Sequence, residues 1–466
     1  MRVQKIFWGI IISSCVFAGL SGNMGCANII PPQGGPKDTL PPVLLTAEPR
    51  DSALHFSGDK ITLNFNEFIE VRDIGNNLIF SPTPEINPYV DYKLKTVTVK
   101  LKDALLPNTT YSINFGNAIQ DFTEGNPLKN FTYTFSTGSY IDSLTLQGQV
   151  INAKTGEPDS TMIVMLHTSG DDSAVVNKKP LYVTKSDGNG HFQFNNLPPG
   201  KFYLYALQDN NRTRRYLSDD VLFAFADKPV TIQPGLQPIT LYAYIGKPAN
   251  ETNKNQAQVS NEAKRLTYHT NLVSNKQELF QNFILTSDRP LQFFDSTKLK
   301  LYKDSTFVPV QDYTIEEDST HTHITLATDW QENTLYHLVL DKDFATDSSG
   351  YQLLKKDSLH FMTKQKSDYG KLKITFRNLD MQKNPVVWLM QQNKIIRSVP
   401  LLSNTMTIEM FPPGEYTLRI LYDNNKNGEW DPGIFFGQHI QPELVQPIKR
   451  KILVKAAWQN EFEIAL

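Results

Sequence analysis

Short runs in which apolar and polar side chains alternate at every second residue recur from residue 43 onward. Residues 61–65, 96–101 and 131–135 each place apolar or aromatic side chains on one face of an extended segment. Turn-forming clusters such as residues 106–109 separate these runs. No stretch beyond residue 26 shows a sustained helical period with capping residues. We therefore predict an all-β chain that folds as a tandem array of four β-sandwich modules.

The composition supports several folded domains and excludes two classes of site. Of the 466 residues, 40% are hydrophobic and 20% are charged, which is enough apolar material for stable cores. At about 100–200 residues per domain, the length predicts roughly three or four domains. The formal net charge is −2, which excludes a strongly basic surface for nucleic acid. Cys15 and Cys26 are the only cysteines, so disulfide frameworks and cysteine-ligated metals are excluded beyond residue 26.

The first residues carry the features of a bacterial export signal. Arg2 and Lys5 precede an apolar run over residues 6–20, which is too short for a typical membrane span. Gly25 and Cys26 follow, and the chain then becomes polar and rich in proline and glycine. This arrangement resembles a lipoprotein signal peptide, with residues 1–25 cleaved and Cys26 lipidated. An ordinary secretory signal with an incidental Cys26 is the alternative.

Asn23 departs from the aliphatic residue that is usual before the lipidated cysteine, and Bacteroidota lipoproteins, whose signals are looser, tolerate this departure. The resemblance to them implies an outer-membrane lipoprotein of the cell envelope, with palmitate-type acyl chains on Cys26. Two or more such chains attach a protein stably to a membrane. Residues 26–40 would form a Pro/Gly-rich tether. No acidic run of the surface-export type follows Cys26, so the periplasmic face and the cell surface both stay open.

One strand pattern occurs twice at a nearly constant spacing. Residues 107–115 correspond to residues 332–340, and residues 133–137 correspond to residues 359–363. The shared N-T-x-Y strand start and final F-x-T resemble the bacterial Ig-like domain first seen in S-layer proteins. The resemblance implies one Ig-like domain over residues 41–139 and a second over residues 266–365.

A second pattern is interleaved with the first. Residues 197–211 begin with Leu-Pro-Pro-Gly and correspond to residues 411–425, which begin with Phe-Pro-Pro-Gly. A tight turn leads into a strand that would bury Phe202, Leu204 and Ala206. This turn and strand resemble the transthyretin-like sandwich of carboxypeptidase regulatory-like modules. The resemblance implies such domains over residues 140–247 and 366–466. Residues 248–265 contain no aromatic side chain and are predicted to be a flexible linker.

One loop carries alternating oxygen-bearing side chains of the kind that bind calcium. Residues 423–428 read D-x-N-x-N-G, in which alternate oxygens converge and the glycine makes a sharp bend. Ile434 stands where calcium loops carry a bidentate glutamate, so a metal-free, Asx-rich hairpin is the alternative. The corresponding residues 209–215 lack the glycine, contain three arginines and are predicted to bind no metal. The predicted calcium ligands are Asp423, Asn425, Asn427 and Asp431.

Two histidines form a weaker candidate for a metal site. His321 and His323 are two residues apart on a predicted strand, so both side chains would lie on one face. With Ile324 and Leu326 facing the core, that face would be exposed, and a polar surface without metal is the alternative. No motif of a serine hydrolase, a zinc protease or a phosphate-binding loop occurs, and we predict no catalytic residue.

One tripeptide recurs more often than the composition predicts. It begins with Asp, continues with Ser or Thr, and ends with an apolar residue or Thr. It resembles the O-glycosylation acceptor of exported Bacteroidota proteins, and glycans there would shield the chain. Asp-Ser also starts turns, which is the alternative explanation. The candidate acceptors are Thr39, Ser52, Ser143, Ser160, Ser173, Ser296, Ser305, Ser319 and Ser358.

These features predict a non-enzymatic cell-envelope lipoprotein that acts as a multi-module spacer, scaffold or binding protein. Its expected partners are the membrane and an envelope protein or glycan, with no nucleic acid and no cofactor other than calcium. The alternative is a carbohydrate-binding or carbohydrate-active accessory protein with a site at a module junction. Trp430, Phe435 and Phe436 are the candidates for a sugar-binding surface, and packing within the protein is their alternative role.

Overall fold

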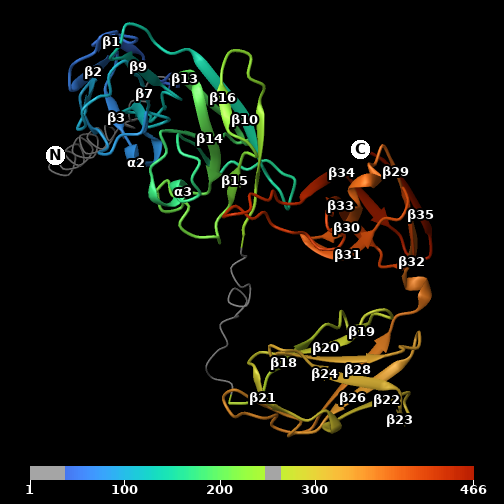
Figure 1. Cartoon of the computed structure of the whole chain (residues 1–466). Helices are drawn as coiled ribbons and strands as arrows, with labels where there is room; N and C mark the ends of the chain where they lie inside the picture. The colour runs from blue at the N-terminus through green and yellow to red at the C-terminus, as the bar shows by residue number, and fades with distance from the viewer. Residues whose placement is uncertain (1–36, 247–263) are drawn as a thin grey trace, which may run out of the picture. The chain divides into compact units, whose positions relative to one another are not determined.

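The computed structural model describes residues 37–246 and 264–466, where strands make up nearly all of the regular structure (Figure 1). The α-helices in these residues are α2 (Ile74–Asn77) and α3 (Ala174–Asn177). No helix in the described residues is long and apolar enough to cross a membrane. The prediction of an all-β array of sandwiches is confirmed. The predicted signal peptide, Cys26 and most of the tether and linker lie outside the described residues.

The first sandwich, within residues 37–140, has sheets of order β1-β2-β6-β5, β4-β7-β9 and β3-β8. Alternation along β2 places Ile61, Leu63 and Phe65 in the core, where each is at most 1% exposed. The rings of Tyr111 and Phe135 stack across β7 and β9 in the same core. The strands are β1 (Leu44–Glu48), β2 (Lys60–Phe65), β3 (Ile69–Val71), β4 (Ile79–Ser81), β5 (Tyr89–Lys93), β6 (Thr96–Lys100), β7 (Thr110–Asn114), β8 (Ile119–Asp121) and β9 (Thr132–Ser136).

The second sandwich, residues 141–246, packs the sheet β13-β10-β17 against the sheet β12-β11-β14-β15, to which β16 adds. Phe202, Leu204 and Ala206 of β14 enter its core as predicted. The strands are β10 (Leu144–Asn152), β11 (Ile163–His167), β12 (Tyr182–Lys185), β13 (His191–Leu197), β14 (Gly200–Leu207), β15 (Phe223–Phe225), β16 (Val230–Ile232) and β17 (Ile239–Ala243).

The third sandwich, residues 264–365, has sheets of order β18-β20-β25-β24, β19-β28-β26-β22-β23 and β21-β27 around one core. Its strands are β18 (Tyr268–Thr270), β19 (Lys276–Gln277), β20 (Phe283–Ser287), β21 (Leu291–Phe294), β22 (Leu299–Lys303), β23 (Val308–Pro309), β24 (Tyr313–Glu317), β25 (His323–Thr328), β26 (Leu335–Leu340), β27 (Ala345–Asp347) and β28 (Asp357–Thr363).

The fourth sandwich, residues 366–466, packs the sheet β32-β29-β35 against the sheet β31-β30-β33-β34. Its strands are β29 (Gly370–Arg377), β30 (Pro385–Gln391), β31 (Lys394–Pro400), β32 (Thr405–Phe411), β33 (Gly414–Tyr422), β34 (Leu444–Val454) and β35 (Gln459–Ala465).

The repeats found in the sequence recur as equivalent strand pairs. Tyr111 lies opposite Phe135 across β7 and β9, and Tyr336 lies opposite Phe361 across β26 and β28. Likewise, β10 pairs in parallel with β17, and β29 pairs in parallel with β35. Each of the four main hydrophobic cores draws its residues from one of the four predicted segments.

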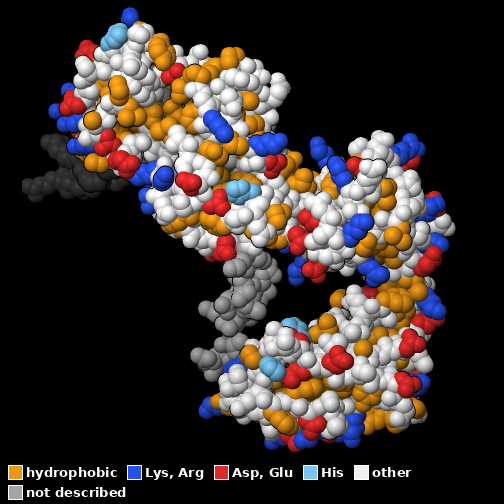
Figure 2. All heavy atoms as spheres, viewed as in Figure 1, with side chains coloured by type: hydrophobic (Ala, Val, Ile, Leu, Met, Phe, Trp, Pro, Cys, Tyr) orange, Lys and Arg blue, Asp and Glu red, His pale blue; other side chains and the backbone are white. Residues whose placement is uncertain are grey.

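The chain divides into two compact units rather than four. One unit holds the first sandwich, and the other holds residues 81–83 and 141–466, so three sandwiches share it. On the face shown in Figure 2, Lys and Arg side chains are interspersed with Asp and Glu side chains. This mixture agrees with the small net charge and provides no broad basic surface on that face.

Candidate functional site

The loop between β33 and β34, residues 423–443, contains the predicted calcium ligands and the candidate sugar-binding aromatic side chains. Its first half is closed by its own hydrogen bonds. The buried carboxylate of Asp423 accepts from the backbone N–H groups of Lys426 (2.6 Å) and Gly428 (2.7 Å). Asp431 Oδ2 accepts from the side-chain amides of Asn425 (2.6 Å) and Asn427 (2.7 Å). These contacts are those of an Asx-rich turn.

Glu443, which sequence reasoning missed, completes this arrangement from the far end of the loop. Its buried carboxylate accepts from the backbone N–H groups of Asn424 (2.6 Å) and Asp431 (3.1 Å). Burial raises the pKa of Glu443 above its ordinary value, and the negative charges of Asp423 and Asp431 raise it further, against the two backbone hydrogen bonds. No local signal links Glu443 to Asp423, because the two are joined only through the folded loop.

The corresponding loop of the second sandwich uses its aspartate in the same way. Asp209 Oδ1 accepts from the backbone N–H of Thr213 (3.0 Å), and Oδ2 accepts from that of Arg214 (2.9 Å). A shared role in turn formation therefore accounts for the aspartate in both copies. In residues 37–246 and 264–466, no three His, Cys, Asp or Glu side chains gather into a metal site.

Calcium binding at residues 423–431 is untested, and the hydrogen bonds within the loop favour the metal-free, Asx-rich hairpin that is its alternative. Calcium takes six to eight oxygen ligands, and here the predicted side chains already accept or donate hydrogen bonds within the loop. We therefore expect about 1 mM calcium, the affinity range of extracellular calcium modules, to leave the thermal unfolding midpoint of the full chain unchanged. A rise in the midpoint that Asp423→Ala abolishes would establish the calcium site instead.

The second half of the loop packs against the second sandwich through aromatic rings. Phe435 is 5% exposed, and its ring centroid lies 5.6 Å from Tyr205, 5.1 Å from Phe223 and 5.3 Å from Phe225. Phe436 is 49% exposed and stacks on Tyr216 at 5.8 Å. Two of the three candidate sugar-binding rings therefore serve the contact between two sandwiches.

The third candidate ring, Trp430, is held beside this contact. Its Nε1–H donates to the carbonyl oxygen of Glu443 (2.8 Å), and Lys154 Nζ lies 5.3 Å from its ring centroid. The ammonium of Lys154, from the second sandwich, is placed for a cation–π interaction. Packing, the alternative role noted for these aromatic residues, describes all three in this structure.

Polar contacts surround the aromatic rings of the same interface. Asp172 accepts from the backbone N–H of Gly437 (2.7 Å) and lies 2.6 Å from His439 Nε2. Against the effect of burial, these two contacts lower the pKa of Asp172. The amide of Gln441 donates to the carbonyl oxygen of Phe225 (2.9 Å). The loop is thus fixed to the second sandwich by specific polar contacts as well as apolar area.

At the edge of the interface between the second and fourth sandwiches, the backbones of the two sandwiches come close together near Gly156. Val445 N–H donates to the carbonyl oxygen of Ala153 (2.9 Å). A Cβ on Gly156, whose φ is +70°, would lie 2.2 Å from the carbonyl oxygen of Val445 and 2.3 Å from Pro447 Cδ. Only glycine fits this position, because any side chain would overlap the fourth sandwich.

The third and fourth sandwiches are also joined by side chains. Tyr369 O–H donates to Glu278 Oε2 (2.6 Å) and accepts from the backbone N–H of Leu279 (2.9 Å). Lys364 forms an ion pair with the other oxygen of Glu278, and Phe280 packs edge-on against Tyr369. Contacts of the fourth sandwich with both others explain why residues 141–466 form one compact unit.

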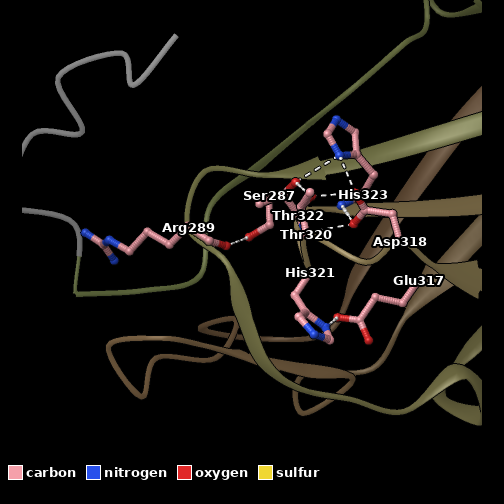
Figure 3. A network of polar contacts seen from close by, with 8 residues as sticks. All are labelled: Ser287, Arg289, Glu317, Asp318, Thr320, His321, Thr322 and His323. Carbon is pink, nitrogen blue, oxygen red and sulfur yellow. Dashed lines mark hydrogen bonds and ion pairs between the residues drawn. The ribbon is translucent and has the colours of Figure 1, made fainter. Parts of the chain in front are cut away.

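The pair His321 and His323 does not lie on one strand face. β25 begins at His323, and His321, with φ +55°, belongs to the preceding turn. His321 Nδ1 lies 3.0 Å from Glu317 Oε1, whereas the His323 ring faces Asp318 and Thr322, so the two rings point apart (Figure 3). The predicted shared face was wrong, because alternation applies only within the strand. Ile324 and Leu326 are buried as predicted.

Asp318 organises the turn that holds these two histidines (Figure 3). Its carboxylate accepts from Thr320 Oγ1 (2.5 Å) and from the backbone N–H groups of Thr322 (3.0 Å) and His323 (2.9 Å). Although burial acts in the opposite direction, these hydrogen bonds hold the pKa of Asp318 well below its ordinary value. The network is a satisfied turn, and the polar-surface interpretation of His321 and His323 fits it.

The candidate glycan acceptors lie mostly at the surface. Ser358, in β28, is half-buried, and the other eight acceptors are exposed. Several of the preceding aspartates also cap turns: Asp159 accepts from the backbone N–H of Thr161, and Asp295 accepts from that of Thr297. Exposure and turn formation therefore coexist at these sites, and glycosylation stays a prediction.

One family model matches part of the chain. Residues 38–137, which form the first sandwich, match the bacterial Ig-like domain. The resemblance seen in the sequence for residues 41–139 therefore rests on an independent match. No curated protein matches the sequence.

Several solved structures match the chain at low similarity. The N-terminal part of the bacterial S-layer protein SbsC is 15% identical, with a TM-score of 0.17, over 36% of this chain and 40% of that one. The Bacillus anthracis TIE protein is 11% identical, with a TM-score of 0.18, over 93% and 75%. The major pilin subunit BcpA of Bacillus cereus is 9% identical, with a TM-score of 0.15, over 70% and 99%. TM-scores of this size carry no argument about function.

Proposed function

We propose that this chain is a non-enzymatic cell-envelope lipoprotein, anchored through Cys26, whose β-sandwiches act as a spacer or scaffold. The bacterial Ig-like domain at residues 38–137 supports an extracytoplasmic structural role. The lipoprotein-like residues 1–26 support attachment to the outer membrane, on its periplasmic face or at the cell surface. The second and fourth sandwiches are proposed to be transthyretin-like modules, and the third a further Ig-like module.

The observation that carries the scaffold role is the seating of the β33–β34 loop on the second sandwich. A freely jointed string of domains would not hold its parts at fixed distances. Here Phe435, Phe436, His439 and Gln441 contact the second sandwich, although the chain between them passes through the whole third sandwich. Such contacts join sandwiches within the unit of residues 141–466, as a spacer or a scaffold for an envelope partner requires.

The carbohydrate-binding alternative would place a sugar at a module junction, on open aromatic rings. At the junction of the second and fourth sandwiches, Phe435 is buried and Trp430 is engaged by Lys154 and Glu443. Of the three candidate rings, Phe436 is the most exposed, and one of its faces is stacked on Tyr216. These contacts favour the scaffold over a sugar-binding surface at this junction.

Lipid attachment is tested by substitution of the two cysteines. Cys26→Ala is expected to abolish incorporation of labelled palmitate in the native host and to move the protein from the membrane fraction to the soluble fraction. Cys15→Ala is the matched control and should leave both properties unchanged, because Cys15 would leave with the signal peptide. Palmitate on the Cys26→Ala protein would contradict the proposed anchor.

A further inference from the structure

His337 and His360 face each other on the outer face of the third sandwich. They lie directly opposite across β26 and β28, which run side by side (Figure 1). Tyr336 and Leu338 point into the core, so His337 lies on the other face of β26. Nevertheless, His337 is only 6% exposed, because Phe307, from the turn between β22 and β23, stacks on its ring at 4.2 Å. His360 is exposed.

The hydrogen bonds of His337 fix which ring nitrogen carries the proton. Its Nε2 lies 3.1 Å from the backbone carbonyl oxygen of Asp304, which can only accept, so Nε2 carries the hydrogen. The lone pair of the neutral ring is then on Nδ1. This Nδ1 lies 2.5 Å from Nδ1 of His360, so His360 donates the single proton between them. A histidine whose second nitrogen is anchored to a carbonyl in this way has the usual arrangement of a metal ligand.

The fold itself does not require histidines at this pair of positions. In the first sandwich, Ser112 and Thr134 form the equivalent cross-strand pair, next to Tyr111 and Phe135. In the third sandwich, His337 and His360 occupy it, next to Tyr336 and Phe361. The two imidazoles are therefore a property of the third sandwich that its architecture does not explain.

We propose that His337 and His360 bind a divalent transition-metal cation of the zinc class through their Nδ1 atoms. The metal takes the place of the proton between the two nitrogens, and His360 then carries its hydrogen on Nε2, so both imidazoles bind as neutral ligands. Zinc–nitrogen bonds of about 2.0–2.1 Å and a tetrahedral angle separate two ligand nitrogens by about 3.3–3.4 Å. The two Nδ1 atoms are 2.5 Å apart, so they must separate to reach this distance. His360 is exposed and can rotate outward to do so, while Phe307 and Asp304 hold His337 in place. Water or a group from a partner completes the coordination.

The test is a calorimetric titration of the untagged full-length chain with zinc chloride at neutral pH. We expect one zinc ion to bind at this pair. The double variant His337→Ser/His360→Thr installs the residues of the first sandwich. It should weaken binding by at least about tenfold, since it removes both ligands.

Two further variants keep the result specific. His321→Ala/His323→Ala removes the other neighbouring histidines and should leave the zinc isotherm unchanged. If circular dichroism shows that the double variant is unfolded, His360→Ala decides instead, because His360 is exposed and its loss leaves the core intact. An isotherm unaffected by loss of His360, or no zinc binding by the wild-type chain, would overturn the proposal.

Discussion

Replacing Phe435 with alanine is expected to release the β33–β34 loop from the second sandwich. The ring packs against Tyr205, Phe223 and Phe225 and is almost fully buried. Truncating a buried phenylalanine removes transfer free energy and leaves a cavity, a combined cost of about 3–5 kcal/mol. Because the ring lies between two sandwiches rather than inside one, the cost falls on their contact and leaves both cores folded.

Small-angle X-ray scattering and hydrogen exchange measure this release directly. We expect a larger radius of gyration for Phe435→Ala, with faster exchange at β15 and at residues 433–443. Phe293→Ala is the matched control, because Phe293 is an exposed phenylalanine of the third sandwich. Equal scattering and exchange for Phe435→Ala and the wild type would refute the fixed contact on which the proposed scaffold rests.

A second variant, at the edge of the contact between the second and fourth sandwiches, is expected to weaken the same contact. Gly156→Ala should also loosen the fourth sandwich, because its Cβ would overlap Val445 and Pro447. Gly235→Ala is the control: Gly235 has a similar positive φ of +78°, yet nothing lies within 4 Å of its added Cβ. The difference between the two variants isolates the overlap from the backbone strain that both share.

Acidification is expected to destabilise the second sandwich through His167. The side chain is 2% exposed, its Nε2 has no hydrogen-bond partner in the described part of the chain, and its ring meets the edge of Tyr205. Burial, with a smaller effect of Lys178, lowers the pKa of His167 from 6.5 to about 4. Between about pH 4 and pH 6.5, the unfolded chain therefore binds a proton on His167 that the folded chain does not bind.

The sign follows from this difference. The stability that the second sandwich gains from a neutral His167 is fully present above about pH 6.5. It falls as the pH drops toward about 4 and then levels off. The total loss of unfolding free energy across this range is about 3 kcal/mol. Hydrogen exchange of peptides from the second sandwich across this range measures the loss. His167→Leu should flatten the profile, and His269→Leu, which replaces an exposed histidine of the third sandwich, should not. A profile that His167→Leu leaves unchanged would rule out His167 as the cause.

Local patterns in the sequence predicted core side chains on particular strands of the first three sandwiches. Ile61, Leu63 and Phe65 alternate along one strand, and the core positions of Phe202 and Leu204 follow directly from that period. Alternation failed at His321 because the strand begins two residues later, at His323. Turn geometry depends on single φ values, such as +55° at His321, that a periodic pattern does not encode.

The candidate sites depended on contacts that join distant parts of the chain. The calcium pattern identified Asp423 and Asn427 but not Glu443, which approaches them only when the loop closes. The pair His337 and His360 could have been predicted from the sequence, since the repeat places both on outward positions of corresponding strands. Their facing nitrogens required the register of β26 against β28.

The sequence by itself determined the all-β class, because alternation and turn residues act over a few neighbouring positions. It also showed that two strand patterns each occur twice, since a repeat is a property of order alone. Only the tertiary structure decided that Phe435 and Phe436 pack on the second sandwich, and that residues 141–466 form one unit. The physical reason is that hydrophobic contact is non-directional, so an aromatic residue does not specify its partner until long-range packing brings one to it.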